Sequence, residues 1–283
     1  MKNHLPKFLR VLILFIFLIL LIVFGVLFYA FKIEPYLLRT KQYTLNADFT
    51  KPLKIVQVSD IQISKHFTIE NLKKVINKIN EQEADIVLFT GDLYEIYAEY
   101  HDDEALIAEL SKIESRLGKY AIWGNRDYGG GAVRQYEDIM EKSGIYLLRN
   151  EAVSITVTGE EHLFLAGLDD ALLGAPDITE IMEKFTDHRY LYSILMTHEP
   201  DTADLYSKLG FDLIVAGHSH GGQVNIPLLP QIKTTLAEKY VDGFYSLNDQ
   251  TSLYVNSGIG TSRFPMRLGV IPEITVFSLE RET

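Results

Sequence analysis

The first part of the chain is dominated by one unbroken apolar run. Residues 11–31 carry no charged side chain and are nearly all Leu, Ile, Phe or Val. As a helix, this run is about 31 Å long, which matches the hydrocarbon core of a bilayer. A core helix of a globular domain would need a polar face, and this run has none. We therefore predict a membrane anchor over residues 11–31, preceded by a basic tail over residues 1–10.

A cleaved signal peptide is the alternative interpretation of this run. The apolar region of such a peptide is usually about 7–15 residues long and ends in small side chains. Here the run is longer and ends in the bulky pair Phe28 and Tyr29. Basic side chains flank the run about equally, but a short basic tail before a long polar domain commonly places that domain outside. We expect a single-pass protein of the cell membrane with an extracytoplasmic domain.

Beyond a polar linker over residues 32–52, short apolar runs alternate with amphipathic stretches. The runs 54–59, 85–90 and 212–216 are typical of strands buried on both faces, and 68–82 has the apolar period of a helix. Further strands are expected at 119–123, 154–157, 162–166, 192–196, 252–256 and 273–279, and helices at 104–117, 133–142, 178–185 and 200–208. This alternation predicts an α/β protein with one domain over residues 53–283.

Composition narrows the chemistry of this domain. The chain is 47% hydrophobic, which excludes general disorder, and it has no cysteine. Disulfides, zinc–thiolate sites, iron–sulfur clusters and a cysteine nucleophile are therefore excluded. The net charge of −11 combines +5 over residues 1–41 with −16 over the rest. Because a −16 domain has no broad basic face, we expect no long nucleic acid as a partner.

Polar side chains able to bind a metal follow the ends of five predicted strands. They are Asp60, Asp92, Asn125, His198, His218 and His220. The carboxyl ends of strands in α/β sheets line one crevice, so these side chains are expected to converge. Oxygen and imidazole donors suit Mn²⁺, Fe or Zn²⁺, and a bridging carboxylate could hold two ions about 3.5–4 Å apart. Taken singly, the aspartates could instead be turn or cap residues.

These residues belong to an ordered series of motifs: SDIQ (59–62), GDLYE (91–95), GNRD (124–127), TH (197–198) and GHSH (217–220). The series resembles the calcineurin-like metallophosphoesterase superfamily. GHSHGGQV (217–224) and LYVNSGIGTSRFPMR (253–267) look like its membrane-anchored bacterial branch. The resemblance covers nearly all of residues 53–280. It implies a two-sheet β-sandwich flanked by helices and two divalent metal ions with a water between them that attacks phosphorus.

The resemblance also implies which residues hold each ion. Asp92 would bridge the two, Asp60 and His220 would complete the first site, and Asn125, His198 and His218 the second. The family usually has His where this chain has Gln62, a weaker donor to transition metals. Glu95 could compensate as an additional ligand or lie outside the ligand shell.

The GNRD motif departs from the family pattern as well. Arg126 stands where the family usually has a histidine that helps the leaving group depart. An arginine stays protonated and cannot act as an acid, but it can clamp phosphate oxygens. This favours diphosphates, and the same string occurs in UDP-2,3-diacylglucosamine diphosphatases. We take Arg126 and Asp127 as candidate catalytic residues; alternatively, the two only form an ion pair. Arg263 and Arg267 are candidate substrate-binding residues or solvated surface groups.

The sequence thus predicts metal-dependent hydrolysis of phosphoester or diphosphate bonds at the membrane surface. The expected substrate is a phosphorylated or diphosphate small molecule or a lipid-linked one. The alternative is a degenerate member of the same fold that binds a phosphorylated ligand without turnover, which Gln62 and Arg126 motivate. A nuclease is disfavoured by the acidic charge.

Overall fold

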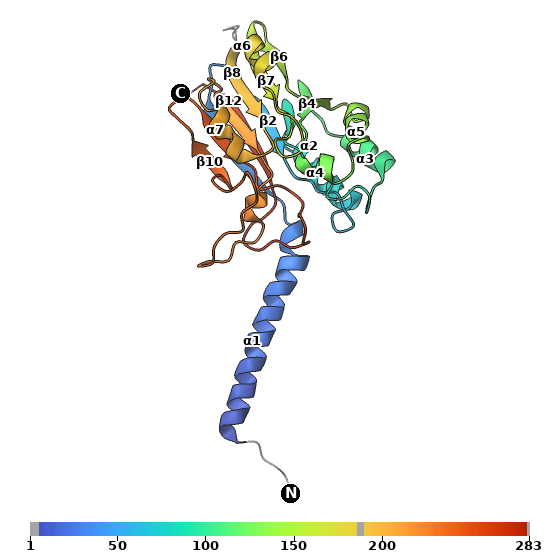
Figure 1. The fold of residues 1–283 in the computed structure, drawn as a ribbon, viewed down its shortest axis with the longest axis vertical. Coiled ribbons are helices and arrows are strands. Elements are labelled where there is room, and N and C mark those ends of the chain that lie inside the picture. The colour runs from blue at the N-terminus through green and yellow to red at the C-terminus, as the bar shows by residue number, and fades with distance from the viewer. Residues whose placement is uncertain (1–5, 186–189, 282–283) are drawn as a thin grey trace.

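A long helix leads into two packed sheets in the computed structural model, which describes residues 6–185 and 190–281 (Figure 1). The helices are α1 (Lys7–Lys32), α2 (Ile69–Asn80), α3 (Asp103–Leu110), α4 (Asn125–Gly129), α5 (Tyr136–Lys142), α6 (Thr179–Phe185) and α7 (Ala203–Tyr206), with 3₁₀ turns η1 (Glu34–Tyr36), η2 (Pro200–Thr202) and η3 (His220–Gly222). The strands are β1 (Arg39–Asn46), β2 (Leu53–Val58), β3 (Ile86–Phe89), β4 (Gly118–Ala121), β5 (Tyr146–Leu147), β6 (Glu151–Thr158), β7 (Glu161–Gly167), β8 (Tyr190–Met196), β9 (Leu213–Ala216), β10 (Gly243–Ser246), β11 (Ser252–Val255) and β12 (Glu273–Glu280).

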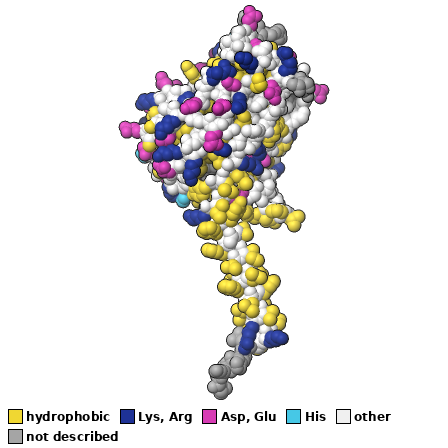
Figure 2. Space-filling model, turned by 180° about the vertical axis from the view of Figure 1, so that it is seen from behind, with side chains coloured by type: hydrophobic (Ala, Val, Ile, Leu, Met, Phe, Trp, Pro, Cys, Tyr) yellow, Lys and Arg dark blue, Asp and Glu magenta, His cyan; other side chains and the backbone are white. Residues whose placement is uncertain are grey.

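Helix α1 covers the apolar run and projects away from the sheets. Of its 26 residues, those at 11–31 are apolar on every side of the helix and largely exposed, as the yellow side chains along the stalk in Figure 2 show. Ala30, in the last turn, is the buried residue of this helix. Among the helices of the described ranges, α1 is the one long and apolar enough to cross a membrane. The predicted N-terminal transmembrane candidate is therefore confirmed as a helix.

The first sheet has the strand order β1-β12-β2-β3-β4-β5. Strands β2 to β5 run parallel, and β12 is antiparallel to β2. At the edge, β1 pairs in parallel with β12, from Arg39 opposite Glu273 to Asn46 opposite Glu280. The range 32–52 was expected to be a linker, and that expectation is wrong for residues 39–46. Half-exposed edge strands can be mostly polar, which is why apolar runs do not reveal this one.

The second sheet has the strand order β10-β11-β9-β8-β7-β6, and its inner strands β7, β8, β9 and β11 run parallel. Between the sheets lies an apolar core to which β2 contributes Leu53 and Ile55 and β8 contributes Ile194 and Met196. The alternate side chains of β2 face outward against α2, α3 and α5, and α6 and α7 cover the second sheet. Both faces of each inner strand are buried, which accounts for the continuous apolar runs. The predicted two-sheet sandwich flanked by helices is confirmed.

Two expected helices are shorter than their sequence pattern. The helix expected over 104–117 ends at Leu110, because the backbone amides of Arg116 and Leu117 bond to the carbonyls of Ala84 and Asp85 at the start of β3. The stretch 200–208 divides into η2 and α7.

Candidate metal centre

The predicted ligands converge where the strands end. Asp60 follows β2, Asp92 follows β3, His198 follows β8, and His218 follows β9. The loops after β2 and β3 are joined by backbone bonds, from the Asp60 amide to the Gly91 carbonyl at 3.0 Å and from the Gln62 amide to the Asp92 carbonyl at 3.1 Å. The loops after β2 and β3 therefore lie side by side at the same edge of the sheet.

Several of these residues have strained backbone conformations. Positive φ angles of 50–66° occur at Asp60, Gln62, Asp92, His218 and His220. Such angles are costly for residues other than glycine, roughly 1–2 kcal/mol each. Strained residues gather at functional sites, where the surrounding structure holds them in place. The clustering therefore marks this edge as the functional one.

The close packing of the loops also explains the glycine before His218. A Cβ atom on Gly217 would lie 1.8 Å from the Ser59 hydroxyl oxygen and 2.5 Å from Asp60 Oδ2. The GHSH loop can reach Asp60 because this position has no side chain. The backbone amide of His218 then donates to Asp60 Oδ2 at 2.9 Å.

Two carboxylates and one imidazole form the centre of the cluster. Asp60, Asp92 and His198 each offer a ligand atom, and these atoms lie within 4.8 Å of one another. Asp92 Oδ1 lies 3.4 Å from His198 Nε2, and Asp60 Oδ1 lies 3.4 Å from His220 Nε2. Asp60 Oδ1 is buried and has no hydrogen-bond partner within the described part of the chain. Burial alone would raise the pKa of Asp92, but the charge and hydrogen bond of His198, the Arg126 amide and the charge of His218 together outweigh burial and hold this pKa below its ordinary value.

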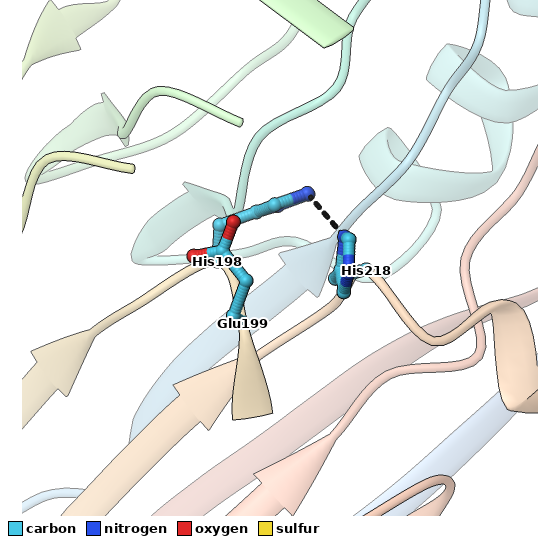
Figure 3. Close-up of side chains that lie close together, drawn as sticks. All are labelled: His198, Glu199 and His218. Carbon is cyan, nitrogen blue, oxygen red and sulfur yellow. Dashed lines mark hydrogen bonds between the residues drawn. The ribbon is translucent and has the colours of Figure 1, made fainter. Parts of the chain in front are cut away.

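His198 and His218 face each other with nitrogen atoms 3.3 Å apart, as the dashed line in Figure 3 shows. His198 Nδ1 lies 2.6 Å from the Thr90 carbonyl, and His218 Nε2 lies 2.9 Å from the Thr235 carbonyl. Because a carbonyl only accepts, these two nitrogens carry protons, and in the neutral rings the facing nitrogens present lone pairs. Either a proton on His198 Nε2 or a metal ion between the rings would satisfy these facing nitrogens. Burial lowers the pKa of His198, but the charge and hydrogen bond of Asp92 together with the charges of Glu199 and Asp60 outweigh burial and raise this pKa well above its ordinary value.

Asn125 completes this side of the cluster, and Glu199 adds a carboxylate that the sequence analysis missed. Asn125 begins α4, and its Oδ1 lies 3.3 Å from His198 Nε2. Glu199 could share a metal ion with His198 and His218 (Figure 3). Burial and the neighbouring Asp170 raise the pKa of Glu199 to about 8. In the sequence, the only indication that Glu199 could belong to the metal centre is its position directly after His198.

The two residues considered for the missing family ligand differ in position. Gln62 lies inside the cluster, where its Nε2 donates to Asp92 Oδ2 at 2.8 Å and its Oε1 is buried without a partner among the described residues. Glu95 lies farther out. Its Oε1 accepts from the Arg263 amide at 2.9 Å and lies 3.5 Å from Arg126 Nη2. Glu95 therefore contacts Arg126 and the backbone of Arg263, whereas Gln62 is the residue that contacts Asp92.

Arg126 and Asp127 do not act as an ion pair. The Asp127 carboxylate is buried and accepts from the backbone amides of Asp92, Leu93 and Gly124, each at 2.9 Å. Burial and the Asp92 charge raise the pKa of Asp127 to about 8. Asp127 thus fixes the loops after β3 and β4 and does not face the open side of the site.

Arg126 faces the open side instead. Its Nη2 donates to the Ser262 hydroxyl at 2.8 Å, and its backbone amide donates to Asp92 Oδ1 at 2.7 Å. It lines a cavity of about 640 Å³ together with Asp92, His218, Arg263 and other residues. The candidate Arg267 is not among the lining residues. It is fully buried, donates to the Gly260 carbonyl at 2.6 Å and lies 3.4 Å from His220 Nδ1. Arg267 was expected to bind substrate. This expectation is corrected, because the side chain is buried next to His220 and does not reach the cavity.

Sequence comparison agrees with this geometry. The family model described as calcineurin-like phosphoesterase matches residues 53–222. The chain belongs to this family. It is 36% identical over 249 residues to the uncharacterized metallophosphoesterase YkuE of Bacillus subtilis, covering 86% of each chain. It is 30% identical to the transmembrane protein with metallophosphoesterase domain of Bos taurus, covering 81% of this chain and 53% of the relative. Phosphodiesterase YaeI of Escherichia coli is 26% identical, covering 82% and 84%.

As a calcineurin-like phosphoesterase, the chain is a hydrolase that acts on phosphoesters, and the family typically uses divalent metal ions. The residues present fit such ions. Asp60 Oδ1 and Gln62 Oε1 are buried acceptors without partners among the described residues, and nitrogen atoms of His198 and His218 face each other at 3.3 Å. Oxygen and imidazole donors of this kind suit Mn²⁺, Fe or Zn²⁺. The apolar helix and the transmembrane relatives indicate a membrane protein.

Proposed function

We propose that the chain hydrolyses phosphodiester or diphosphate bonds at the membrane surface with two bound divalent ions. The observation that carries this proposal is the convergence of buried carboxylate and imidazole groups on one point, above all Asp60 Oδ1, which has no hydrogen-bond partner among the described residues, and the facing nitrogens of His198 and His218. Burying a polar atom without a partner is costly, and a bound cation would remove that cost.

In this proposal the ligands divide between the two ions as the family pattern implies. Asp60 and His220 would hold the first ion, and Gln62 could add its carbonyl oxygen. Asn125, His198 and His218 would hold the second ion, and Asp92 would be shared by both. The bound ions would supply a water nucleophile at neutral pH and stabilise the charge that develops on the phosphoryl oxygens.

The protein side chains then position the substrate and hold its charge. Arg126 is fixed by Ser262 and Glu95 at the wall of the cavity, so its guanidinium can bind a phosphoryl oxygen without losing much side-chain freedom. It cannot give a proton to the leaving group. The site therefore favours a leaving group that needs little protonation, such as the phosphoryl group of a diphosphate.

The walls of the cavity fit a substrate with both charged and apolar parts. Arg126, Lys233 and Arg263 provide cations, whereas Leu173 and Phe264 provide apolar surface on the same cavity. Phosphorylated small molecules fit the charged part, and a lipid-linked diphosphate would fit both. We place the domain outside the cytoplasm, as the basic tail before α1 favours.

The test uses the full chain in nanodiscs with Mn²⁺. The substrates are bis-(p-nitrophenyl) phosphate, p-nitrophenyl phosphate, a nucleotide diphosphate ester and a panel of lipid-linked diphosphates. We expect turnover of the diester and diphosphate substrates, which Asp92→Asn abolishes together with bound metal measured by elemental analysis. Asp138→Asn, an exposed aspartate in α5, is the matched control and should leave both unchanged.

The competing function is binding of a phosphorylated ligand without turnover, which Gln62 and Arg126 motivate. It predicts saturable binding of a nucleotide diphosphate ester with no hydrolysis under any of Mn²⁺, Fe²⁺ or Zn²⁺. That result would refute the proposed hydrolysis while leaving the metal site intact.

A further inference from the structure

An exposed apolar surface borders the cavity. Its large side chains are Leu228, Leu229, Ile232 and Phe264, with relative exposures of 103%, 60%, 60% and 67%. We call these four residues the apolar rim. Ile232 and Phe264 also line the cavity. Large apolar side chains gathered on a surface mark an interaction site, whereas single ones are ordinary.

The backbone at Leu228 presents its side chain outward at a cost. The Leu229 amide donates to the Ile226 carbonyl at 3.1 Å, which closes a turn with Pro227 and Leu228 at its centre. Leu228 has a φ of 73° there, a conformation that favours Gly or Asn. Neither backbone preference nor packing within the described chain accounts for a fully exposed leucine at this position. A partner outside the chain would account for it.

The segment that carries Phe264 is fixed to the end of the membrane helix. The Arg267 amide donates to the Ala30 carbonyl at 3.0 Å, and the Val270 amide donates to the Glu34 carboxylate at 2.6 Å. Ala30 is one residue from the end of the apolar run 11–31. Residues 267–270 therefore lie at the level where α1 leaves the hydrocarbon core.

The loop that carries Leu228 is tied to the same segment. The Asn225 amide donates to the Leu268 carbonyl at 2.7 Å, and Leu228 is three residues further along. Phe264 is four residues before Leu268. At no more than about 3.6 Å per residue, Leu228 lies within about 11 Å of Asn225, and Phe264 lies within about 14 Å of Leu268. Figure 1 shows these orange and red loops at the end of the globule where α1 enters, and Figure 2 shows yellow side chains gathered there from behind.

We propose that the apolar rim docks on the same bilayer that α1 crosses, so that the cavity opens at the membrane surface. The bilayer is the occupant that the geometry favours, because the rim is continuous with the point where α1 ends. Lys233 and Arg263 are next to rim residues in the sequence, and Lys32 lies in the last turn of α1; these basic side chains suit anionic lipid headgroups. The proposal stands apart from the proposed hydrolysis, since membrane contact and turnover are measured separately.

The test places a nitroxide label on the rim of the full chain in nanodiscs of phosphatidylethanolamine and phosphatidylglycerol. The chain has no cysteine, so Leu228→Cys provides a unique attachment site. The readout is the ratio of label collisions with oxygen, which partitions into lipid, to collisions with a water-soluble nickel chelate. Leu191→Cys is the matched control, because Leu191 is exposed near the start of β8 and the other end of β8 leads to His198.

We expect the ratio at position 228 to exceed that at position 191 by about threefold or more, as for side chains at the headgroup boundary. A label at Phe264→Cys should give a similarly high ratio. Adding Leu228→Ser and Leu229→Ser should lower the ratio at position 264 by about half, since these leucines hold the rim in the lipid. Equal ratios at 228 and 191 would overturn the proposal. Dipolar coupling between labels at 228 on two chains would also overturn it, because a second copy would then cover the rim.

Discussion

Three backbone amides converge on the carboxylate of Asp127, so the substitution Asp127→Asn tests how the centre is held. The Leu93 amide donates to Oδ1, and the amides of Asp92 and Gly124 donate to Oδ2. An asparagine fills the same space but offers one acceptor oxygen, so its NH₂ group must face at least one of these buried amides. The substitution therefore removes one hydrogen bond and leaves a buried donor without a partner.

The cost follows from the two losses. A hydrogen bond to a charged group contributes about 1.5–3 kcal/mol, and a buried donor without a partner costs about 1–3 kcal/mol. We expect Asp127→Asn to lower the free energy of unfolding by about 2.5–4 kcal/mol, the lower part of the combined range of about 2.5–6 kcal/mol. The lower part applies because the charged carboxylate of Asp127 is itself costly to bury beside Asp92, which raises its pKa to about 8. A neutral asparagine side chain does not have this electrostatic cost.

The assay is urea unfolding of the full chain in detergent micelles, with a chelator present so that metal binding does not contribute. Trp123, the only tryptophan, reports directly on this region, since its ring packs on Tyr128 at 4.5 Å and on Tyr136 at 4.6 Å between centroids. Asp138→Asn is the control; its side chain is 57% exposed in an ion pair with Lys142, and its loss should cost at most about 0.5 kcal/mol. If the two variants unfold within about 0.5 kcal/mol of each other, the three amides do not depend on the Asp127 charge.

Further variants test the remaining parts of the site. Gln62→His should tighten Mn²⁺ binding by about tenfold in a metal titration, because it replaces an amide oxygen with an imidazole; unchanged affinity would place Gln62 outside the ligand shell. Arg126→Ala should lower kcat/KM for a diphosphate by about 10–100-fold while metal content stays the same, and an equal loss for p-nitrophenyl phosphate would argue against a diphosphate clamp. Gly217→Ala should lower the free energy of unfolding by about 1–3 kcal/mol or more, because its Cβ would lie 1.8 Å from the Ser59 hydroxyl oxygen; a change of less than about 0.5 kcal/mol would contradict this.

The sequence predicted the convergence of the ligands because their placement follows from local pattern and topology. Asp60, Asp92 and His198 each follow a buried strand, and strand ends of an α/β sheet meet at one edge. The sequence did not predict the edge strand β1, because its side chains are mostly polar and alternate between half-buried and exposed positions. Its pairing with β12 also joins residues more than 230 positions apart.

The sequence could not predict which hydrogen-bond partners the side chains of the site would have. Arg126 was expected to bind substrate or to pair with its neighbour Asp127, yet its hydroxyl partner is Ser262, 136 residues away. Asp127 is adjacent in sequence, but its carboxylate turns toward three backbone amides. Arg267 is a charged residue in a loop, where exposure is the usual outcome, and it is fully buried. These outcomes depend on which loops meet, and apolar periodicity carries no information about that.

The structure joins two parts that the sequence presents as separate, the membrane helix and the metal centre. Arg267 is the link. Its backbone amide bonds to the last turn of α1 at Ala30, whereas its guanidinium bonds to the Gly260 carbonyl and lies 3.4 Å from His220 Nδ1. Burial lowers the pKa of Arg267 to about 10, which still leaves it charged at neutral pH, so this buried cation needs these acceptors in place. Arg267 therefore contacts both the last turn of α1 and His220, and a change at the membrane boundary would reach the candidate ligand through these two contacts.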